Sequence, residues 1–328
     1  MKRRTELLAA LLAVAAGASS FAPGEAQAYC RMTSCPETKG PGQACEPRGE
    51  DDCGTPLSWE RECVGFSLQR DASSAVPLSK ARDVLAKAFN TWVRASCGGA
   101  ESPSIGVQDI GPADCDEVEY STDKANANVI VFRDEAWPHD DDSVLALTTV
   151  TYSLSSGEIY DADMEVNTAD HRFTTDDASP DIDLLSVATH EAGHFLGLAH
   201  SPDETSTMFA AYTPGTLGQR SLAPDDVQAI CAAYPPGDGA HGACDPTPRH
   251  GFSPLCAADQ KEASSGEGGS GGSGGEDGDP DDGGSGGSKS PAALACAVSP
   301  GSEGGGDPFA WALSALAAIG ALRRSRRG

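Results

Sequence analysis

The stretch His190–His200 reads HEAGHFLGLAH, and the spacing of its histidines predicts a catalytic metal site. His190 and His194 are four residues apart, so on a helix their imidazoles lie one turn apart on one face. Gly197 can end that helix in a left-handed turn, and the returning chain then brings His200 to the same ion. Three protein ligands leave a fourth position for water, which is typical of catalytic and not of structural zinc.

Glu191 directly follows the first histidine, and we interpret it as a general base. A glutamate in this place can accept a proton from the water at the metal without being a ligand itself. A lone pair of histidines on a helix is often only a surface feature. Here the longer pattern fixes five positions, which makes a chance match improbable.

The pattern HExxHxxGxxH followed by a methionine turn resembles the metzincin zinc peptidases, and its details resemble their matrixin branch. Met208 falls eight residues after His200, and Ser201 follows that histidine directly, as in matrixins. The resemblance covers roughly residues 56–236. It implies an α+β fold with a twisted mixed sheet, a long first helix, an active-site helix that carries HExxH, and a C-terminal helix. It also implies a zinc endopeptidase in which Met208 lies beneath the metal without binding it.

The resemblance further indicates where a substrate pocket would lie. Tyr212, four residues after Met208, is similar to the tyrosine that walls the S1′ pocket of matrixins, and Leu185 and Val187 are weaker candidates for the same wall. Ala210 departs from the family, which usually carries proline at that position. The outer wall of the pocket, and with it the specificity, is left open.

Apolar spacing predicts the elements around the site. Helical periodicity predicts a helix at about residues 79–95. Short apolar runs predict strands at Cys63–Leu68, Val129–Phe132, Val144–Leu154 and Glu158–Asn167. In a matrixin-like fold the strand at 144–154 forms the upper rim of the cleft, so its free edge could pair with an extended peptide substrate.

Two helix boundaries follow from capping residues. Asp181 or Asp183 is expected to cap the active-site helix, because a short acidic side chain can accept hydrogen bonds from the first turn. Pro224 and the two acids after it are expected to open a last helix that runs to about Tyr234.

Asp161, Asp163 and Glu165 alternate along the predicted strand at 158–167 and therefore share one face. Clustered carboxylates could bind calcium, which takes oxygen ligands, and matrixins place calcium nearby. A solvated acidic face is the alternative, and it is the favoured interpretation. Matrixins also hold a second, structural zinc in this region, but its histidines are missing here and only His139 has a suggestive position. We expect one catalytic zinc and leave calcium open.

The first 28 residues predict a secretory signal peptide. They begin with basic residues, continue with the apolar run Leu7–Ala16, and end in Ala26-Gln27-Ala28, a typical cleavage site. A retained membrane anchor is the alternative. The formal net charge of −26 argues against a nucleic-acid partner, because phosphate binding requires a basic face.

All eleven cysteines lie beyond the predicted cleavage site, and ten of them fall between Cys30 and Cys256. In an exported protein this predicts up to five disulfides, with metal binding by the cysteines as the alternative. The connectivity cannot be deduced from sequence. Plausible local pairs are Cys97 with Cys115 and Cys244 with Cys256.

The segment 29–56 is cysteine-rich and too poor in apolar residues to form its own core. Its sequence Cys53-Gly54-Thr55-Pro56 is similar to the CGxP of the matrixin cysteine switch, in which a propeptide thiolate occupies the zinc. A disulfide is the alternative role for Cys53, and it is favoured because only 24 residues separate Cys53 from the predicted cleavage site.

The C-terminal part divides by composition. After the peptidase domain at 57–236 come a cysteine-containing extension at 237–260, a linker of Gly, Ser and acidic residues at 261–290, and a tail at 291–328. The tail holds Cys296, a short apolar run and an arginine cluster, and it resembles the C-terminal sorting signals of bacterial, particularly myxobacterial, surface proteins.

That resemblance makes Cys296 a candidate lipid-attachment or processing site, with a plain tail anchor as the alternative. The expected location is the bacterial cell surface or outer membrane, or the medium after release. The expected partners are protein or peptide substrates, and the oligomeric state is not predicted. An inactive adhesion or binding module on a peptidase scaffold is the rival function, although no histidine and no glutamate of the pattern is lost.

Overall fold

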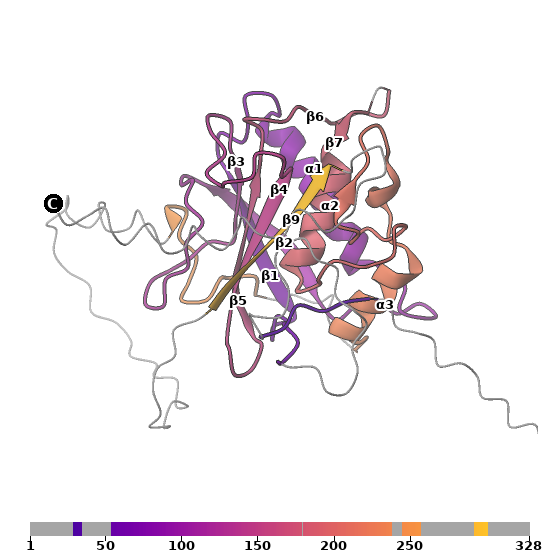
Figure 1. The fold of residues 1–328 in the computed structure, drawn as a ribbon. Helices are drawn as coiled ribbons and strands as arrows, with labels where there is room; N and C mark the ends of the chain where they lie inside the picture. Colours follow the sequence, from indigo (N-terminus) through magenta and orange to yellow (C-terminus); the bar gives the residue numbers. More distant parts are fainter. Residues whose placement is uncertain (1–28, 35–53, 179, 238–244, 257–291, 301–328) are drawn as a thin grey trace, which may run out of the picture.

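The computed structural model describes residues 29–34, 54–178, 180–237, 245–256 and 292–300, the last range as backbone (Figure 1). The signal peptide, most of the cysteine-rich segment with Cys53, the linker at 261–290 and the residues after 300 lie outside the described residues. No helix in the described part is long and apolar enough to cross a membrane. In chain order the elements are β1 (Cys63–Gln69), α1 (Leu78–Val93), β2 (Gly106–Ala113), β3 (Val129–Phe132), β4 (Ala146–Tyr152), β5 (Ile159–Val166), β6 (Phe173–Thr174), β7 (Ile182–Asp183), α2 (Leu184–Phe195), β8 (Ala211–Tyr212), η1 (Gly218–Arg220), α3 (Pro224–Ala233) and β9 (Ala292–Pro300).

The main sheet has the strand order β2-β1-β3-β5-β4-β9-β8. β1 runs parallel to β2 and β3, and β3 runs parallel to β5. β4 is antiparallel to β5, which makes the sheet mixed. The predicted α+β fold with a mixed sheet, a long first helix, an HExxH helix and a C-terminal helix is therefore confirmed. The four predicted strands and the first helix also lie within about two residues of their observed bounds.

Helices α1 and α2 lie on one face of the sheet, and the main core fills the space between them and the strands (Figure 1). Phe89 of α1 packs its ring between those of Phe66 on β1 and Phe195 on α2, with centroids 4.8 and 5.0 Å apart. Trp92 of α1 is fully buried, and its Nε1 donates a 2.7 Å hydrogen bond to the carbonyl of Thr189. The apolar face of α1 thereby fixes the position of the helix that carries the histidines.

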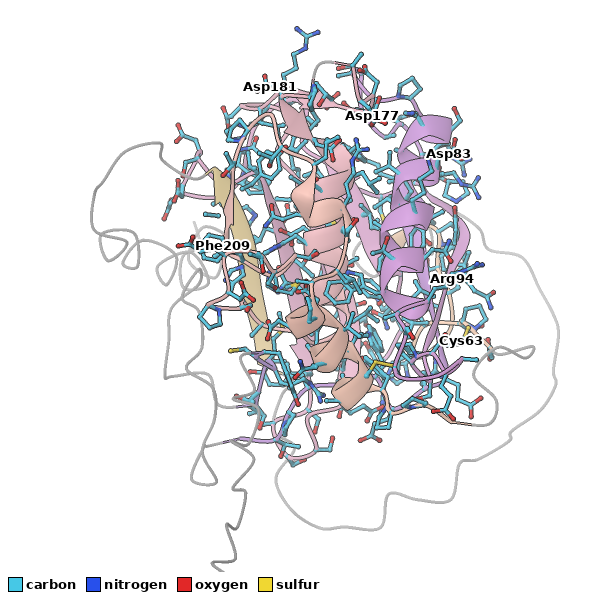
Figure 2. The ribbon with its side chains drawn as sticks, turned by 90° about the vertical axis from the view of Figure 1, so that its right-hand side faces the viewer. Cys63, Asp83, Arg94, Asp177, Asp181 and Phe209 are labelled. Carbon is cyan, nitrogen blue, oxygen red and sulfur yellow. A yellow bond between two sulfur atoms is a disulfide. The ribbon has the colours of Figure 1, made fainter. Side chains whose placement is uncertain are left out.

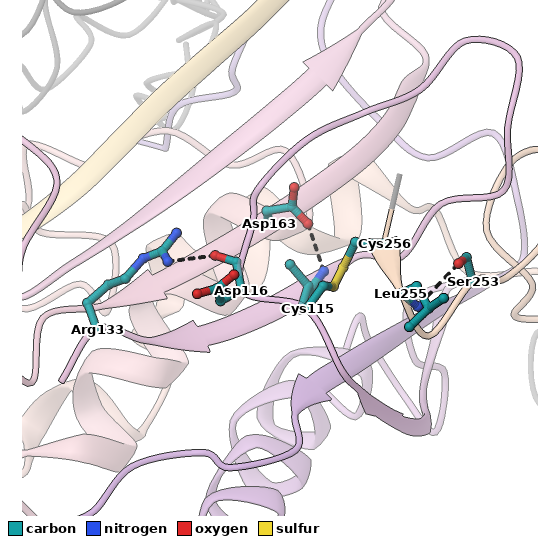
Figure 3. The surroundings of a disulfide bond; sticks show 8 residues. Cys115, Asp116, Arg133, Asp163, Ser253, Leu255 and Cys256 are labelled. Atoms are coloured by element: carbon teal, nitrogen blue, oxygen red, sulfur yellow. Dashed lines mark hydrogen bonds between the residues drawn. A yellow bond between two sulfur atoms is a disulfide. The ribbon is translucent and has the colours of Figure 1, made fainter. Parts of the chain in front are cut away.

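A smaller core cluster lies beside β3 and joins it to the C-terminal extension. The disulfide Cys115–Cys256 closes this cluster (Figure 3). A second disulfide joins Cys97, after α1, to Cys231 on α3. Cys30 and Cys63 are disulfide-bonded as well.

The pairing of Cys97 with Cys115 and of Cys256 with Cys244 is thus wrong. The observed bridges span 134 and 141 residues of sequence, because the fold brings α3 next to the end of α1 and the extension next to β3. Cysteines that are close in sequence were preferred as partners, although only distance in the folded chain decides the pairing.

Candidate metal centre

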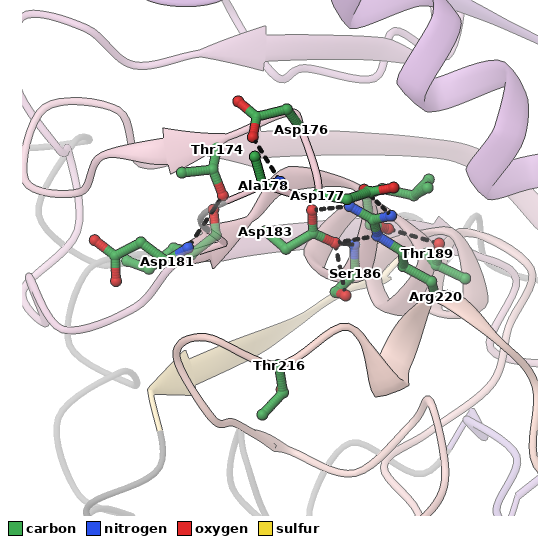
Figure 4. A network of polar contacts seen from close by, with 12 residues as sticks. Thr174, Asp176, Asp177, Ala178, Asp181, Asp183, Ser186, Thr189, Thr216 and Arg220 are labelled. Atoms are coloured by element: carbon green, nitrogen blue, oxygen red, sulfur yellow. Dashed lines mark hydrogen bonds and ion pairs between the residues drawn. The ribbon is translucent and has the colours of Figure 1, made fainter.

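The start of α2 is held by a buried carboxylate. Asp183 is the N-cap, and its Oδ2 accepts a 2.8 Å hydrogen bond from the amide of Ser186 (Figure 4). Arg220 donates from Nε and Nη2 to the two carboxylate oxygens of Asp183, at 2.7 and 2.6 Å, and from Nη1 to Asp177 at 2.6 Å. The hydrogen bonds to Asp183 are the main reason that the pKa of Arg220 is raised. Of the two predicted caps, Asp183 is the one observed.

The end of α2 is a Schellman turn centred on Gly197, whose φ is +83°. The amide of Gly197 donates to the carbonyl of His194 at 2.9 Å, and the amide of Leu198 donates to that of Gly193 at 3.0 Å. A Cβ at position 197 would meet the carbonyl oxygen of Leu57 at 2.7 Å. Glycine is therefore required here, and the turn sends the chain back toward His200.

Residues from distant parts of the chain donate hydrogen bonds to the carbonyls at the C-terminal end of α2, which have no partner within the helix. Trp59 donates from Nε1 to the carbonyl of Phe195 at 2.8 Å, and the Tyr234 hydroxyl donates to that of Leu196 at 3.0 Å. The amide of Met32 donates to the carbonyl of Gly197 at 3.0 Å. The C-terminal end of the active-site helix is thereby fixed to both the start and the end of the domain.

The three histidines converge through their Nε2 atoms. Nε2 of His194 lies 3.0 Å from that of His190 and 3.1 Å from that of His200, and the remaining side of the triangle is 3.2 Å. All three side chains are buried. Nitrogens at this separation can all lie about 2.0–2.1 Å from one ion, which is the usual Zn–N distance. In the described part of the chain, no other group of three or more ligating side chains comes together.

The hydrogen bonds and pKa values of His190 and His194 keep the Nε2 atoms unprotonated, as binding of a cation requires. Nδ1 of His190 lies 2.7 Å from the carbonyl of Thr207, and Nδ1 of His194 lies 2.8 Å from that of Leu198. A carbonyl only accepts hydrogen bonds, so each Nδ1 carries the proton and each Nε2 presents a lone pair. Burial lowers the pKa of His190 to about 4. Burial and the neighbouring His200 and His190 place the pKa of His194 well below its usual value. Neutral nitrogens therefore face one another, as metal ligands require.

Glu191 is fully buried on α2, between two of the histidines in sequence. Its Oε2 accepts a 2.5 Å hydrogen bond from the hydroxyl of Thr148 on β4. The sequence analysis did not identify Thr148, because no motif contains it. The only available signal was its position on the strand predicted to form the rim of the cleft.

Met208 packs directly against α2. A Cβ on Gly193 would collide with Sδ of Met208 and would lie 2.8 Å from Cζ2 of Trp92. Position 193, one residue before His194, therefore has room only for glycine because the buried Met208 side chain occupies the space beside it. The resemblance placed Met208 beneath the metal; the structure places it against the helix that carries two of the histidines.

The methionine turn is held by the carboxylate of Asp226. The sequence predicts this residue only as an acid in the first turn of the last helix. Asp226, in the first turn of α3, accepts hydrogen bonds from Ser206 Oγ at 2.5 Å and from the amides of Thr207 and Met208 at 2.7 and 3.2 Å. It also accepts from the amide of Ala223 at 2.8 Å, which caps α3. One buried side chain thus joins the last helix to the turn beside the metal centre.

The predicted pocket residues have different surroundings. Tyr212 is buried, and its hydroxyl accepts from the amide of Asp183 at 3.0 Å and lies 2.8 Å from the carbonyl of Thr216. Val187 is also buried, and Leu185 is partly buried against the main core. Tyr212 therefore ties β8 to the start of α2, and the assignment of these three side chains to an S1′ wall stays a prediction.

The acidic residues of β5 are buried, so a solvated acidic face is wrong. The strand lies between β3 and β4, which cover its edges. Glu165 binds Nη2 of Arg133 at 2.6 Å and Nε2 of His139 at 2.9 Å. Burial alone would raise the pKa of Glu165, but the hydrogen bond from His139 and the charge of Arg133 outweigh it and lower that pKa.

Asp163 Oδ1 accepts a 2.7 Å hydrogen bond from the amide of Val129 (Figure 3). Burial raises the pKa of Asp161 to about 7, and burial together with Asp161 places the pKa of Asp163 well above its usual value. Asp161, Asp163 and Glu165 do not come together as one group of ligands in the structure, and calcium binding by them stays a prediction. Cys296 lies in β9, where its backbone is in register with Thr148. Cys53 lies outside the described residues.

Comparison with known proteins adds two findings. The sequence profile of the matrixin peptidases matches residues 58–235, which is more than half of the 328 residues. A segment of 35 residues is 54% identical to Metalloendoproteinase 1-MMP of Arabidopsis thaliana. That segment makes up 11% of this chain and 10% of the plant protein, so the match spans about a tenth of that relative.

Proposed function

The chain belongs to the matrixin family, and we propose that it is a zinc-dependent endopeptidase that hydrolyses peptide bonds of extracellular proteins. The observation that carries the proposal is the triangle of buried Nε2 atoms, with Glu191 on the same helix. His190, His194 and His200 would hold Zn²⁺. When bound, zinc supplies a Lewis acid that polarises a substrate carbonyl and makes water more acidic.

The remaining chemistry belongs to the residues of the chain. Glu191 accepts a proton from the attacking water and then delivers it to the leaving amine. The hydroxyl of Thr148 donates to Oε2 of that carboxylate and so positions it. The Nδ1–H groups of His190 and His194 are fixed by backbone carbonyls, so neither ring can rotate away from the centre.

We further propose that residues 1–28 direct secretion and that the tail holds the protein at the bacterial surface, with Cys296 as the attachment or processing site. These proposals come from the sequence pattern. Mass spectrometry of the mature protein would test them, since it locates both processed ends and any group on Cys296. An unprocessed tail without a modified cysteine would contradict the attachment.

The central test measures metal and hydrolysis together. Purified protein should contain one zinc per chain and should cut casein or a quenched peptide library, and a chelator should remove both properties until zinc is added back. The rival function, an inactive binding module, predicts bound metal without hydrolysis. Protein that binds no zinc when folded would overturn the endopeptidase proposal.

A further inference from the structure

The strand β9 lies along the edge of β4 and contacts α2. It pairs antiparallel with β4 over the full length of that strand, from Ala146 opposite Val298 to Tyr152 opposite Ala292. Figures 1 and 2 show the yellow strand running beside α2, the helix that carries His190 and His194, and α2 and β9 are in contact. Without β9, β4 would be an edge strand of the mixed sheet.

The register places the middle of β9 opposite Thr148, the residue that contacts Glu191. The backbone of Cys296 is paired with Thr148, and the Thr148 hydroxyl donates to Glu191. The next stretch of β9 pairs in parallel with β8, with Ser299 opposite Ala211 and Pro300 opposite Tyr212. An extended chain in this place therefore pairs with β4 along residues 292–298 and with β8 at residues 299–300, and its middle is in register with Thr148.

This arrangement has the properties of peptide recognition by strand addition. An exposed strand edge offers backbone amides and carbonyls that bind any extended peptide, largely independent of its sequence. The sequence of β9, Ala-Ala-Leu-Ala-Cys-Ala-Val-Ser-Pro, contains no charged residue. An edge that is already paired with β9 cannot pair with a second peptide.

We infer that residues 292–300 act as an internal occupant of the peptide-binding edge of β4 and hold the peptidase in a restrained state. The inference rests on the proposed function, because β9 can restrain hydrolysis only if the edge of β4 binds the peptide substrate. The blocked edge is that of β4, and Cys296 is the residue of β9 whose backbone is in register with Thr148. Substrate gains access when β9 leaves β4.

The test replaces two successive residues of β9 with proline, Leu294→Pro together with Ala295→Pro, in the full chain. Successive amides of a strand point to opposite edges, so two prolines remove at least one hydrogen bond to β4 whatever the orientation. The matched control carries Ser285→Pro and Gly286→Pro, which lie before the strand in the Gly/Ser-rich sequence. Hydrogen exchange and hydrolysis of a quenched peptide are measured on both zinc-loaded variants.

We expect amides of β4 to exchange about tenfold faster or more in the β9 variant than in the control, while β1 and α1 keep their protection. We expect kcat/KM to rise about tenfold as well. A synthetic peptide of residues 292–300, added to the β9 variant, should inhibit competitively and restore protection of β4.

The two readouts separate the failure of this inference from the failure of the proposed function. Unchanged exchange of β4 in the β9 variant would overturn the inference, whatever the activity. Faster exchange of β4 with an unchanged rate of hydrolysis would contradict the claim that β9 restrains the peptidase, because β9 would then pair with β4 without blocking substrate. If neither variant hydrolyses any peptide while exchange changes as expected, the proposed function fails and the occupancy of the edge stands.

Discussion

The hydroxyl of Thr148 donates a 2.5 Å hydrogen bond to Oε2 of Glu191, across the boundary between β4 and α2. The same backbone position of β4 is paired with Cys296 of β9. One residue therefore joins the edge on which a peptide would lie to the group that would act on it. This relationship gives the first two predictions.

Glu191→Ala should abolish peptide hydrolysis and leave the metal in place. The glutamate is not one of the three converging ligands, so zinc content should stay at one per chain, while loss of a general base should lower kcat by about three orders of magnitude. Metal analysis and quenched-peptide kinetics on the same preparation check this. Appreciable residual turnover in a clean preparation would remove Glu191 from the role of base.

Thr148→Val should lower kcat about tenfold with little change in KM, because the side chain keeps its shape and loses only the donor that positions Glu191. Thr148→Ser should recover most of the activity. Thr149→Val on the same strand is the control, since the next residue of a strand points to the other face. The pH dependence of kcat should also shift in Thr148→Val; an unchanged profile would argue against positioning.

Asp226→Ala should lower the free energy of unfolding by on the order of 3 kcal/mol, because it removes the acceptor of the Ser206 hydroxyl and of the amides of Thr207 and Ala223. Asp225→Asn, which affects a single hydrogen bond from Ser201, should cost about 1 kcal/mol or less. Urea unfolding followed by fluorescence measures both. Equal losses in the two variants would contradict the anchoring role of Asp226.

Gly193→Ala should destabilise the protein by about 2 kcal/mol and weaken zinc binding, because the added methyl collides with Met208 and Trp92 beside His194. Gly218→Ala is the control: a Cβ there meets no atom within 4 Å. Thermal unfolding and zinc titration are the measurements. A Gly193→Ala variant with the parent's stability would show that Met208 can move aside at little cost.

Asp161→Asn should reduce the dependence of stability on pH. The pKa of Asp161 is raised from its ordinary value of 3.8 to about 7, and that of Asp163 is raised as well, mainly by burial. The folded state therefore holds protons that the unfolded state has lost, so the free energy of unfolding falls as pH rises from about 4 to about 7.

The variant removes one of the two neighbouring buried carboxyls, so it should be more stable than the parent at pH 8 and show a smaller decline between pH 5 and pH 8. Urea unfolding at the two pH values measures the difference. The exposed Asp142→Asn is the control and should follow the parent. A parallel decline in Asp161→Asn and the parent would mean that the buried pair does not titrate in this range.

The convergence of the three histidines could be predicted from sequence because the information for it is local. The spacing of His190, Glu191 and His194 is a property of one helix, and Gly197 ends that helix with φ of +83° as its residue type predicts. His200 lies beyond the helix, and the turn at Gly197 returns the chain so that His200 reaches the other two histidines. Amphipathic spacing located α1 and the apolar strands for the same reason.

The contacts that support the centre could not be predicted, because they join distant segments. Thr148 reaches Glu191 across 43 residues, and Asp226 reaches Ser206 across 20. The strand β2 was missed because its half-buried residues include Gly111, with φ of +113°, and Pro112, which interrupt an alternating pattern. The disulfide pairing could not be predicted for the same reason, because the bonded cysteines are more than 130 residues apart in sequence.

β9 is the least predictable element, because the composition of residues 291–328 indicates a tail and the pairing with β4 depends on a strand edge that the sequence does not reveal. Its placement has a consequence for handling the protein. Since occupant and groove belong to one polypeptide, their encounter is unimolecular, and diluting a sample leaves the fraction of paired molecules unchanged. Specific activity should therefore be the same at nanomolar and micromolar protein until the chain is severed between Cys256 and Ala292, after which each dilution would release more enzyme.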